Sequence, residues 1–198
     1  DEMNCHSLLY DIELPLARVL ADMELAGFKI DVEGVSLYGE KLSEMAEALK
    51  ERIYTYAGEE FNIGSPKQLG EVLFEKMNLP KSRKTKTGYS TDAETLQKLA
   101  PYHPIIEDIL DYRQVTKLKS TYADGLAKAA DGQGRVHSVF NQTGTATGRL
   151  SSSEPNLQNI PVRTELGRIF RKYFVPKSED HVLIDADYSQ IELRILAH

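Results

Sequence analysis

The sequence predicts an α+β chain that is mainly helical up to about residue 131 and contains strands after that point. Before residue 131, apolar residues recur every three or four positions over long stretches, which is the period of a helix. After it, residues 135–140 alternate between polar and apolar, and residues 182–187 form a short apolar run. The intervening residues 141–165 are rich in Asn, Gln, Thr, Ser and Gly, which is typical of a surface loop.

Local signals place the ends of the helices. A first helix is expected over residues 6–26, with Gly27 as its stop. Asp31 is expected to cap a second helix that runs to about Ala57, and Ser65 with Pro66 to begin a shorter one. A further helix is expected from a capping box formed by Thr91 and Glu94 to about Leu99. A second long helix is expected from about Ile105 to Ala130.

The remaining segments are shorter. Residues 81–88 are polar and basic with no apolar period, which predicts a loop or hairpin. The run at residues 182–187 is expected to be a strand that ends in Asp187, and residues 191–198 to begin a helix. The sequence stops inside that helix without a stop signal.

Composition excludes several classes of protein. The 198 residues are 41% hydrophobic and 27% charged, which is ordinary globular composition. The single cysteine, Cys5, excludes an internal disulfide and a cysteine-ligated metal site. Because the sequence has no apolar run of about 18 residues and no signal-peptide pattern, we expect an intracellular protein.

The net charge of −6 conceals a gradient along the chain. Residues 1–60 contain 14 acidic and 5 basic residues, whereas residues 113–172 contain 4 acidic and 10 basic residues. A basic region in an acidic protein indicates a surface for a polyanion. On charge alone, a solvated basic face is the commoner outcome.

Asp187 is the most informative single residue. It is expected at the end of an apolar strand and before a turn into a helix, where open α/β sheets place ligand and metal sites. Asp185, two residues earlier, would share its strand face, and two carboxylates can hold Mg²⁺. A lone Asp at a strand end is more often a helix cap.

Four motifs occur in one order along the chain. They are Asn62 with 65–69 (SPKQL), 116–122 (TKLKSTY), 145–161 (TATGRLSSSEPNLQNIP) and 187–198 (DYSQIELRILAH). They resemble, in turn, the thumb base, the thumb helix, the template- and primer-contacting segment and the first palm motif of family A DNA polymerases. The resemblance implies a helical thumb followed by a partial antiparallel palm sheet. The implied domains are a palm-entry helix at 1–28, the thumb at 29–134 and the first, truncated part of the palm at 135–198.

The resemblance also implies catalytic roles. Asp187 would be one of two aspartates that bind two Mg²⁺ ions during nucleotidyl transfer from a dNTP to the primer 3′-hydroxyl. The backbone carbonyl of Tyr188 would add a metal ligand. Glu192 would crowd the 2′ carbon of the sugar, and Gln190 would approach the incoming nucleotide or its template partner.

The DNA-binding residues implied by the resemblance fall into three groups. The fork of Arg149 and the amides of Asn156, Gln158 and Asn159 suit acceptors in the minor groove, which occur in every base pair. Arg163 would contact a phosphate. The last group comprises the solvent face of the long helix, opposite its buried residues, and the basic loop at the thumb tip: Arg113, Lys117, Ser120, Lys84 and Lys86.

Parts of the family pattern are absent from these residues. The second catalytic aspartate in its His-Asp-Glu motif, the fingers helix that grips the triphosphate and the exonuclease motifs do not occur. We therefore expect a polymerase fragment that binds primer–template DNA but is inactive alone, from the bacterial cytoplasm and associated with the nucleoid. Uncovered apolar faces would favour self-association or a chain that completes the palm.

Two other functions remain open on sequence grounds. One is a freestanding, non-catalytic module that binds duplex DNA. The other is a small metal-dependent phosphohydrolase that uses Asp185 and Asp187. The end of the chain inside a predicted helix favours the polymerase fragment over both.

Overall fold

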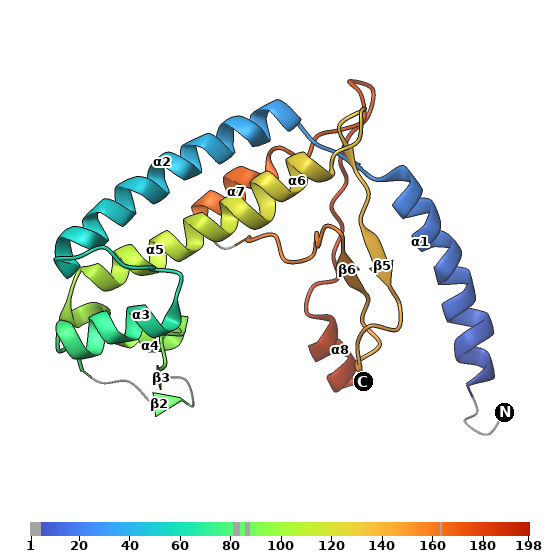
Figure 1. Ribbon diagram of the computed structural model, residues 1–198. Coiled ribbons are helices and arrows are strands. Elements are labelled where there is room, and N and C mark those ends of the chain that lie inside the picture. The colour runs from blue at the N-terminus through green and yellow to red at the C-terminus, as the bar shows by residue number, and fades with distance from the viewer. Residues whose placement is uncertain (1–4, 81–83, 86–87, 163) are drawn as a thin grey trace.

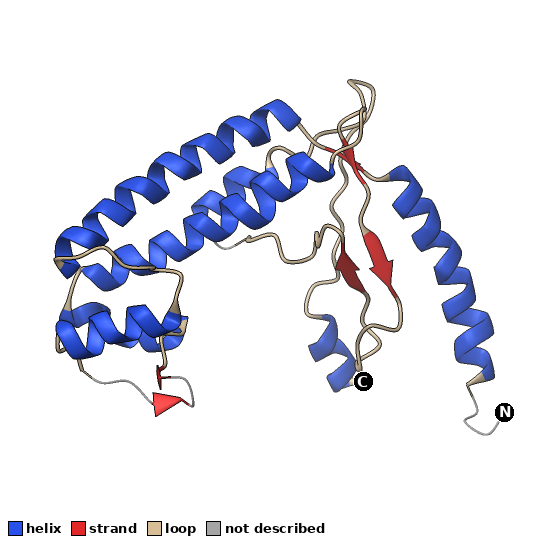
Figure 2. Cartoon of the chain, viewed as in Figure 1, coloured by secondary structure: helices blue, strands red, loops and turns tan. Residues whose placement is uncertain are grey.

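The computed structural model describes residues 5–80, 84–85, 88–162 and 164–198. Figure 1 shows a long pair of helices with a small helical lobe at one end and short strands with a separate helix at the other. Figure 2 shows that helices dominate and that the strands are short. In the described part of the chain, the strands form three two-stranded antiparallel sheets, which confirms the α+β class. No helix in these ranges is both long and apolar enough for a membrane span.

The chain begins with the predicted helix, made of π-helical turns at Leu8–Glu13 (η1) and of α1 at Leu14–Ala26. It ends where predicted, because Gly27 adopts a φ of 59°, which a side chain rarely tolerates. The next two residues form strand β1, Phe28–Lys29.

The long helix α2, Val32–Ala57, has both predicted ends. The Asp31 carboxylate accepts a hydrogen bond of 2.9 Å from the Gly34 N–H, and Gly58 ends the helix in the left-handed region. A second long helical run packs beside α2 (Figure 1). Its parts are α5 (Ile105–Lys117), η4 (Leu118–Ala123) and α6 (Asp124–Ala129).

The lobe at the far end of this pair contains short elements. They are α3 (Pro66–Glu71), η2 (Val72–Lys76), the hairpin strands β2 (Lys84–Thr85) and β3 (Gly88–Tyr89), α4 (Ala93–Leu99) and η3 (Ala100–Tyr102). Ser65 caps α3 as predicted. The capping box predicted for α4 is wrong, since Asp92 rather than Thr91 is the cap and accepts from the Thr95 N–H at 2.7 Å. Thr91 is buried and its polar groups face Arg113 instead.

Two hydrophobic cores lie along the helical pair. The first joins the middle of α2 to η4, α6 and α7 (Glu165–Arg171) and includes Tyr38, Leu42, Leu118, Tyr122, Leu126, Val136 and Phe170. The second fills the far lobe and includes Ile53, Leu69, Leu73, Phe74, Leu96, Ile106 and Ile109. The predicted buried face of the long helix is confirmed, because Val115, Leu118, Tyr122 and Leu126 are at most 3% exposed.

The strand predicted over residues 135–140 is divided in two. β4, Arg135–Val136, pairs with β1, whereas β5, Val139–Asn141, pairs with β6, Ser151–Ser153. The two strands therefore have different partners, and the side chains of the two residues between them bond to other segments. His137 reaches the end of α1, and Ser138 reaches β6 and the loop after it.

The strand predicted at residues 182–187 is absent, although helix α8 at Ile191–Ala197 is present as expected. A strand needs a neighbour to bond its backbone, and no strand of the described residues pairs with this run. Its apolar side chains are also largely exposed, Val182 to 78% and Ile184 to 86%. Asp185 and Asp187 consequently do not share a strand face.

Candidate nucleic-acid interface and catalytic residues

An irregular segment, residues 154–162, presents the predicted amides to solvent. Leu157 and Ile160 turn inward and pack against the first core. The residue before Leu157 and the two between Leu157 and Ile160 are exposed, and they are Asn156, Gln158 and Asn159. One side of the segment therefore presents uncharged hydrogen-bonding groups to solvent, and the other side packs against the first core.

Two of these amides also shape the segment. The Asn156 Oδ1 accepts from the Gln158 N–H at 3.0 Å, which tightens the turn. The Gln158 Nε2 donates to the Leu150 carbonyl at 3.3 Å. The Asn159 side chain has no such structural bond among the described contacts, and its backbone carbonyl accepts from the Tyr122 hydroxyl.

A pair of buried serines, missed by the sequence analysis, holds the start of this segment. The Oγ atoms of Ser138 and Ser152 lie 2.6 Å apart, and both residues are at most 4% exposed. Ser138 donates to the Pro155 carbonyl at 2.8 Å, and Ser152 accepts from the Leu157 N–H at 3.0 Å. No sequence signal distinguishes these serines from their neighbours, because their role depends on a pairing of β5 with β6 across a loop.

The structure brings Arg149 and Glu192 together. The Arg149 Nη2 lies 3.1 Å from the Glu192 Oε1, and both side chains are largely exposed. Arg149 lies in the loop before β6, within the stretch whose composition predicts a surface loop. Two residues that the motifs single out from distant segments thus meet at one surface.

The residues around Asp187 form an exposed turn that leads into α8. Tyr188 is 80% exposed, and Gln190 has a left-handed φ of 54° at the start of the helix. Arg194 donates to the Ser189 carbonyl at 2.9 Å and so closes the turn. The turn leaves the Asp187 carboxylate and the Tyr188 backbone at the surface.

The oxygen donors here suit Mg²⁺ in type, since a carboxylate and a backbone carbonyl are hard ligands. Within the described residues, however, no group of three or more His, Cys, Asp or Glu side chains is placed to hold a metal. Asp187 and Tyr188 therefore fit part of a magnesium site and do not form a complete one.

The basic face of the long helix is less uniform than predicted. Lys117 and Ser120 are exposed, and the Ser120 hydroxyl donates to the Thr116 carbonyl at 2.8 Å. The expectation that Arg113 faces solvent beside them is wrong. Arg113 is half-buried, its guanidinium donates to the carbonyl and hydroxyl of Thr91, and this burial lowers its pKa.

The other basic residues predicted to bind DNA are only partly described. Lys84 lies in β2, where its backbone pairs with Tyr89, and its side chain is not described. Lys86 and Arg163 lie outside the described residues.

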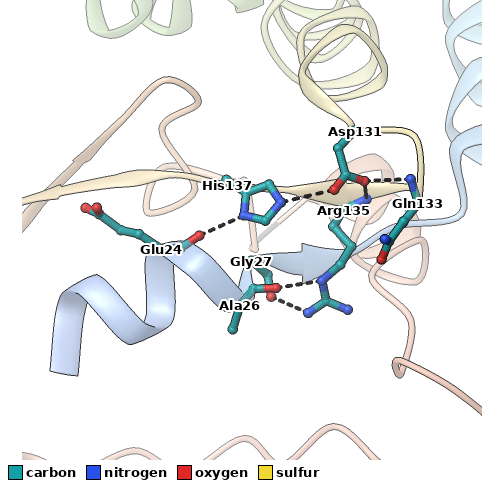
Figure 3. Close-up of polar contacts among 7 residues, drawn as sticks. All are labelled: Glu24, Ala26, Gly27, Asp131, Gln133, Arg135 and His137. Carbon is teal, nitrogen blue, oxygen red and sulfur yellow. Dashed lines mark hydrogen bonds and ion pairs between the residues drawn. The ribbon is translucent and has the colours of Figure 1, made fainter. Parts of the chain in front are cut away.

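A further basic residue, Arg135, has a structural task that the sequence analysis missed (Figure 3). Its guanidinium donates to the carbonyls of Ala26 and Gly27 at 2.6 and 2.7 Å, where α1 ends and its dipole is negative. Asp131 accepts from the Arg135 backbone N–H at 2.8 Å. The charge excess of residues 113–172 is thus partly used inside the molecule and is not all available to a polyanion.

Comparison with known proteins decides which family these features represent. The family model for DNA polymerase family A matches residues 33–198. The chain belongs to DNA polymerase family A. It is 57% identical over 192 residues to DNA polymerase I of Geobacillus stearothermophilus and 54% identical over 192 residues to that of Bacillus subtilis. Each match covers 96% of this chain and 22% of the relative, so the chain spans about a fifth of their length.

A solved polymerase structure has the same fold. It is the POL domain of Pol1 from M. smegmatis in complex with DNA primer-template and dNTP. The TM-score is 0.90 at 47% sequence identity, and the match covers 97% of this chain and 34% of that one. The sequence-based assignment to family A, and to an α+β polymerase fold, is confirmed.

Proposed function

We propose that this chain forms the thumb and the first part of the palm of a template-directed DNA polymerase. The enzyme would transfer nucleotides from dNTPs to a primer 3′-hydroxyl during replication or repair. The observation that carries the proposal is the match, with a TM-score of 0.90, to a polymerase domain in complex with primer-template and dNTP. The exposed amides and the exposed Lys117 support duplex binding independently of that match.

The proposed catalytic contribution centres on Asp187. Its exposed carboxylate and the Tyr188 carbonyl would bind Mg²⁺, which in such enzymes activates the 3′-hydroxyl and stabilises the leaving pyrophosphate. Glu192, in the first turn of α8, would limit the space beside the sugar, and Gln190 would contact the nascent base pair. These residues lie within one short turn and helix, which supports a shared site.

The proposed DNA contacts fall on two surfaces. Arg149, Asn156, Gln158 and Asn159 would face the minor groove near the primer terminus, since hydrogen-bond acceptors there are common to all base pairs. The remaining proposed contacts are to phosphates, and they involve Lys117, Ser120, Arg163, Lys84, Lys86 and, through its remaining donor capacity, Arg113.

The proposed domain boundaries meet at one place. The palm-entry helix at 1–28 and the thumb at 29–134 join at β1, and the palm segment at 135–198 begins at β4, which pairs with β1.

Apolar side chains are exposed on the first helix (η1 and α1) and on α8, including Leu8, Ile12, Leu25, Leu193, Ile195 and Leu196. We further propose that another part of a polymerase polypeptide, or a second copy of this chain, covers them. Light scattering that shows a strict monomer at high concentration would contradict association of the isolated chain.

Two measurements test the proposed function. The 198-residue chain should bind fluorescent primer–template weakly, without sequence preference and with an affinity that falls steeply as salt rises. It should not extend a primer with Mg²⁺ and dNTPs, because it supplies one of the two expected metal-binding aspartates. Extension by this chain alone, or salt-independent binding, would contradict the proposal.

Matched variants of the complete enzyme test the catalytic residue. Asp187→Asn keeps the shape of the side chain but removes its charge, so it should reduce turnover by orders of magnitude with little loss of DNA affinity. Asp185→Asn is the control and should cost much less. A larger loss from Asp185→Asn would show that the metal ligand is assigned to the wrong residue.

A further inference from the structure

The amide-bearing segment, residues 154–162, has no helix or strand to fix it, yet its backbone is held at defined points. The buried pair Ser138 and Ser152 binds its first residues, at the Pro155 carbonyl and the Leu157 N–H. Farther along, the bonds come from the helical pair. The Tyr122 hydroxyl of η4 donates to the Asn159 carbonyl of the segment, and the Tyr38 hydroxyl of α2 donates to the Leu166 carbonyl of α7, the helix after the segment, at 2.9 Å.

These tyrosines are core residues with one polar atom each. Tyr122 is 3% exposed and Tyr38 is 5% exposed. Both rings lie beside Phe170 of α7, with centroids 6.0 and 6.3 Å from it. Burial raises the pKa of both phenols, so they stay protonated and act as donors over the neutral range.

The two parts of each tyrosine have separable tasks. The rings fill the first core, and a phenylalanine would fill nearly the same volume. The Tyr122 hydroxyl bonds a carbonyl of the amide segment, which has few other backbone bonds, and the Tyr38 hydroxyl bonds a carbonyl of α7, the helix that follows the segment. Asn159 supplies the carbonyl and, in the same residue, an exposed amide. A bond to its carbonyl therefore fixes where that amide lies relative to the long helices.

We propose that the hydroxyls of Tyr122 and Tyr38 are positioning groups, which hold the amide segment in register with the helical pair so that both contact one duplex as a rigid unit. This inference rests on the proposed function. Tyr122 acts directly on a residue of the segment that carries an amide, whereas Tyr38 acts on the first turn of α7, after the segment. The larger effect therefore belongs to Tyr122.

The test compares single hydroxyl deletions in the full 198-residue chain. Tyr122→Phe and Tyr38→Phe remove one donor each and keep the ring. Tyr54→Phe is a matched control, since the Tyr54 hydroxyl donates to the Phe61 carbonyl at 2.9 Å in the far lobe, away from the segment. All three variants should lose thermal stability to a similar degree, because each loses one partly buried hydrogen bond.

Primer–template affinity and backbone hydrogen exchange distinguish positioning from stability. Tyr122→Phe should weaken binding about fivefold and speed exchange across residues 156–160, whereas Tyr54→Phe should change affinity less than about twofold. Tyr38→Phe should fall between them. Equal affinities for Tyr122→Phe and Tyr54→Phe would overturn the inference while leaving the proposed function intact. If the unmodified chain bound no primer–template, the proposed function would fall, and the inference with it.

The complete enzyme provides a second readout. Tyr122→Phe should narrow the difference in extension rate between matched and mismatched primer ends. When the amide segment is less firmly held, its side chains discriminate less well between a correct and an incorrect base pair at the primer end. Tyr54→Phe should preserve that difference. A preserved difference in both variants would overturn the positioning role of Tyr122.

Discussion

Arg149 and Glu192, 43 residues apart in sequence, form an ion pair of 3.1 Å between the loop before β6 and the first turn of α8. Their side chains are 76% and 71% exposed. Exposed pairs of this kind contribute about 0–1 kcal/mol to stability. The contact therefore matters for what Arg149 can bind, since a carboxylate competes with any DNA acceptor for the same guanidinium.

The first prediction concerns this competition. Glu192→Gln should tighten primer–template binding by up to about fivefold at low salt, because it frees Arg149 and removes a negative charge. Its thermal stability should be nearly unchanged. Fluorescence anisotropy over a salt series measures the effect. Glu179→Gln, which removes an exposed charge elsewhere, is the control, and weaker binding by Glu192→Gln would show that the pair instead orients Arg149 for DNA.

The second prediction concerns the bond between the two long helices. Arg52 of α2 donates to the Asp108 carboxylate of α5 through two nitrogens, one of them at 3.0 Å, and Asp108 is 8% exposed. Arg52→Met would leave that buried carboxylate without its partner and should lower the unfolding free energy. The exposed pair of Lys98 and Glu94 provides the control, and Lys98→Met should lower the unfolding free energy much less than Arg52→Met. Equal costs in chemical denaturation would disprove this ranking.

The third prediction concerns pH and the end of α1 (Figure 3). The Nδ1 of His137 lies 2.7 Å from the Glu24 carbonyl, and its Nε2 lies 3.3 Å from the Asp131 carboxylate. Both partners only accept hydrogen bonds, so both ring nitrogens donate only when the imidazole is charged. The carbonyl of Glu24, and then Asp131, accordingly raises the pKa of His137 above 6.5, although the neighbouring Arg135 opposes this.

A raised pKa in the folded state stabilises the fold most below pH 6.5, the ordinary value, and this stability is lost as pH rises through the higher, folded value. Asp131 has a lowered pKa, caused first by the Arg135 and Gln133 backbone N–H groups, so its contribution is lost only in acid, below its ordinary value of 3.8. His137→Gln should therefore destabilise the chain more at about pH 5.5 than at about pH 9. Thermal melts at both pH values measure this, and a cost that is independent of pH would contradict a charged imidazole.

The fourth prediction concerns the contact between the amide segment and α7. A methyl group at Gly167 would lie 2.7 Å from the Pro161 Cβ and nearer still to the Pro161 carbonyl oxygen, neither of which can rotate away. Gly167→Ala should therefore cost about 1–3 kcal/mol and weaken DNA binding, because the segment must shift. Gly132→Ala meets nothing within 4 Å and is the control. If Gly167→Ala and Gly132→Ala have the same melting temperature, the close approach of Gly167 to Pro161 is not required for the fold.

Much of the helical architecture could be predicted because its signals are local. Asp31, Gly27 and Ser65 act on backbone groups within a few residues, and they end or begin helices where the sequence indicates. The positions of the strands depend on partners elsewhere, so the run at residues 182–187 looked like a strand but has no strand beside it among the described residues. For the site, the motifs identified which side chains carry the chemistry. The groups that hold them, such as Tyr122 and the serine pair, could not be found, since their bonds join segments 14 to 37 residues apart.

The last prediction separates two residues that the sequence placed in one group. Lys117 and Arg113 are one helical turn apart, and both were predicted to contact phosphates. In the structure Lys117 is exposed, whereas Arg113 is half-buried and donates to the carbonyl and hydroxyl of Thr91. Lys117→Ala should weaken binding to any duplex and reduce the salt dependence by about one phosphate contact, with an unchanged melting temperature.

Arg113→Ala should chiefly lower stability rather than remove a direct contact with DNA. It leaves the buried Thr91 without its donors at the start of α4, so we expect a loss of about 1–3 kcal/mol of unfolding free energy. Helix α4 follows the β2–β3 hairpin, and the hairpin carries Lys84. Any loss of DNA affinity in Arg113→Ala should therefore arise from a changed orientation of that lobe. Arg113→Lys keeps the charge but not the two-pronged contact, and should remain nearly as unstable as Arg113→Ala. If Arg113→Lys instead restored stability and affinity fully, the charge of Arg113 rather than its bond to Thr91 would be what the chain requires.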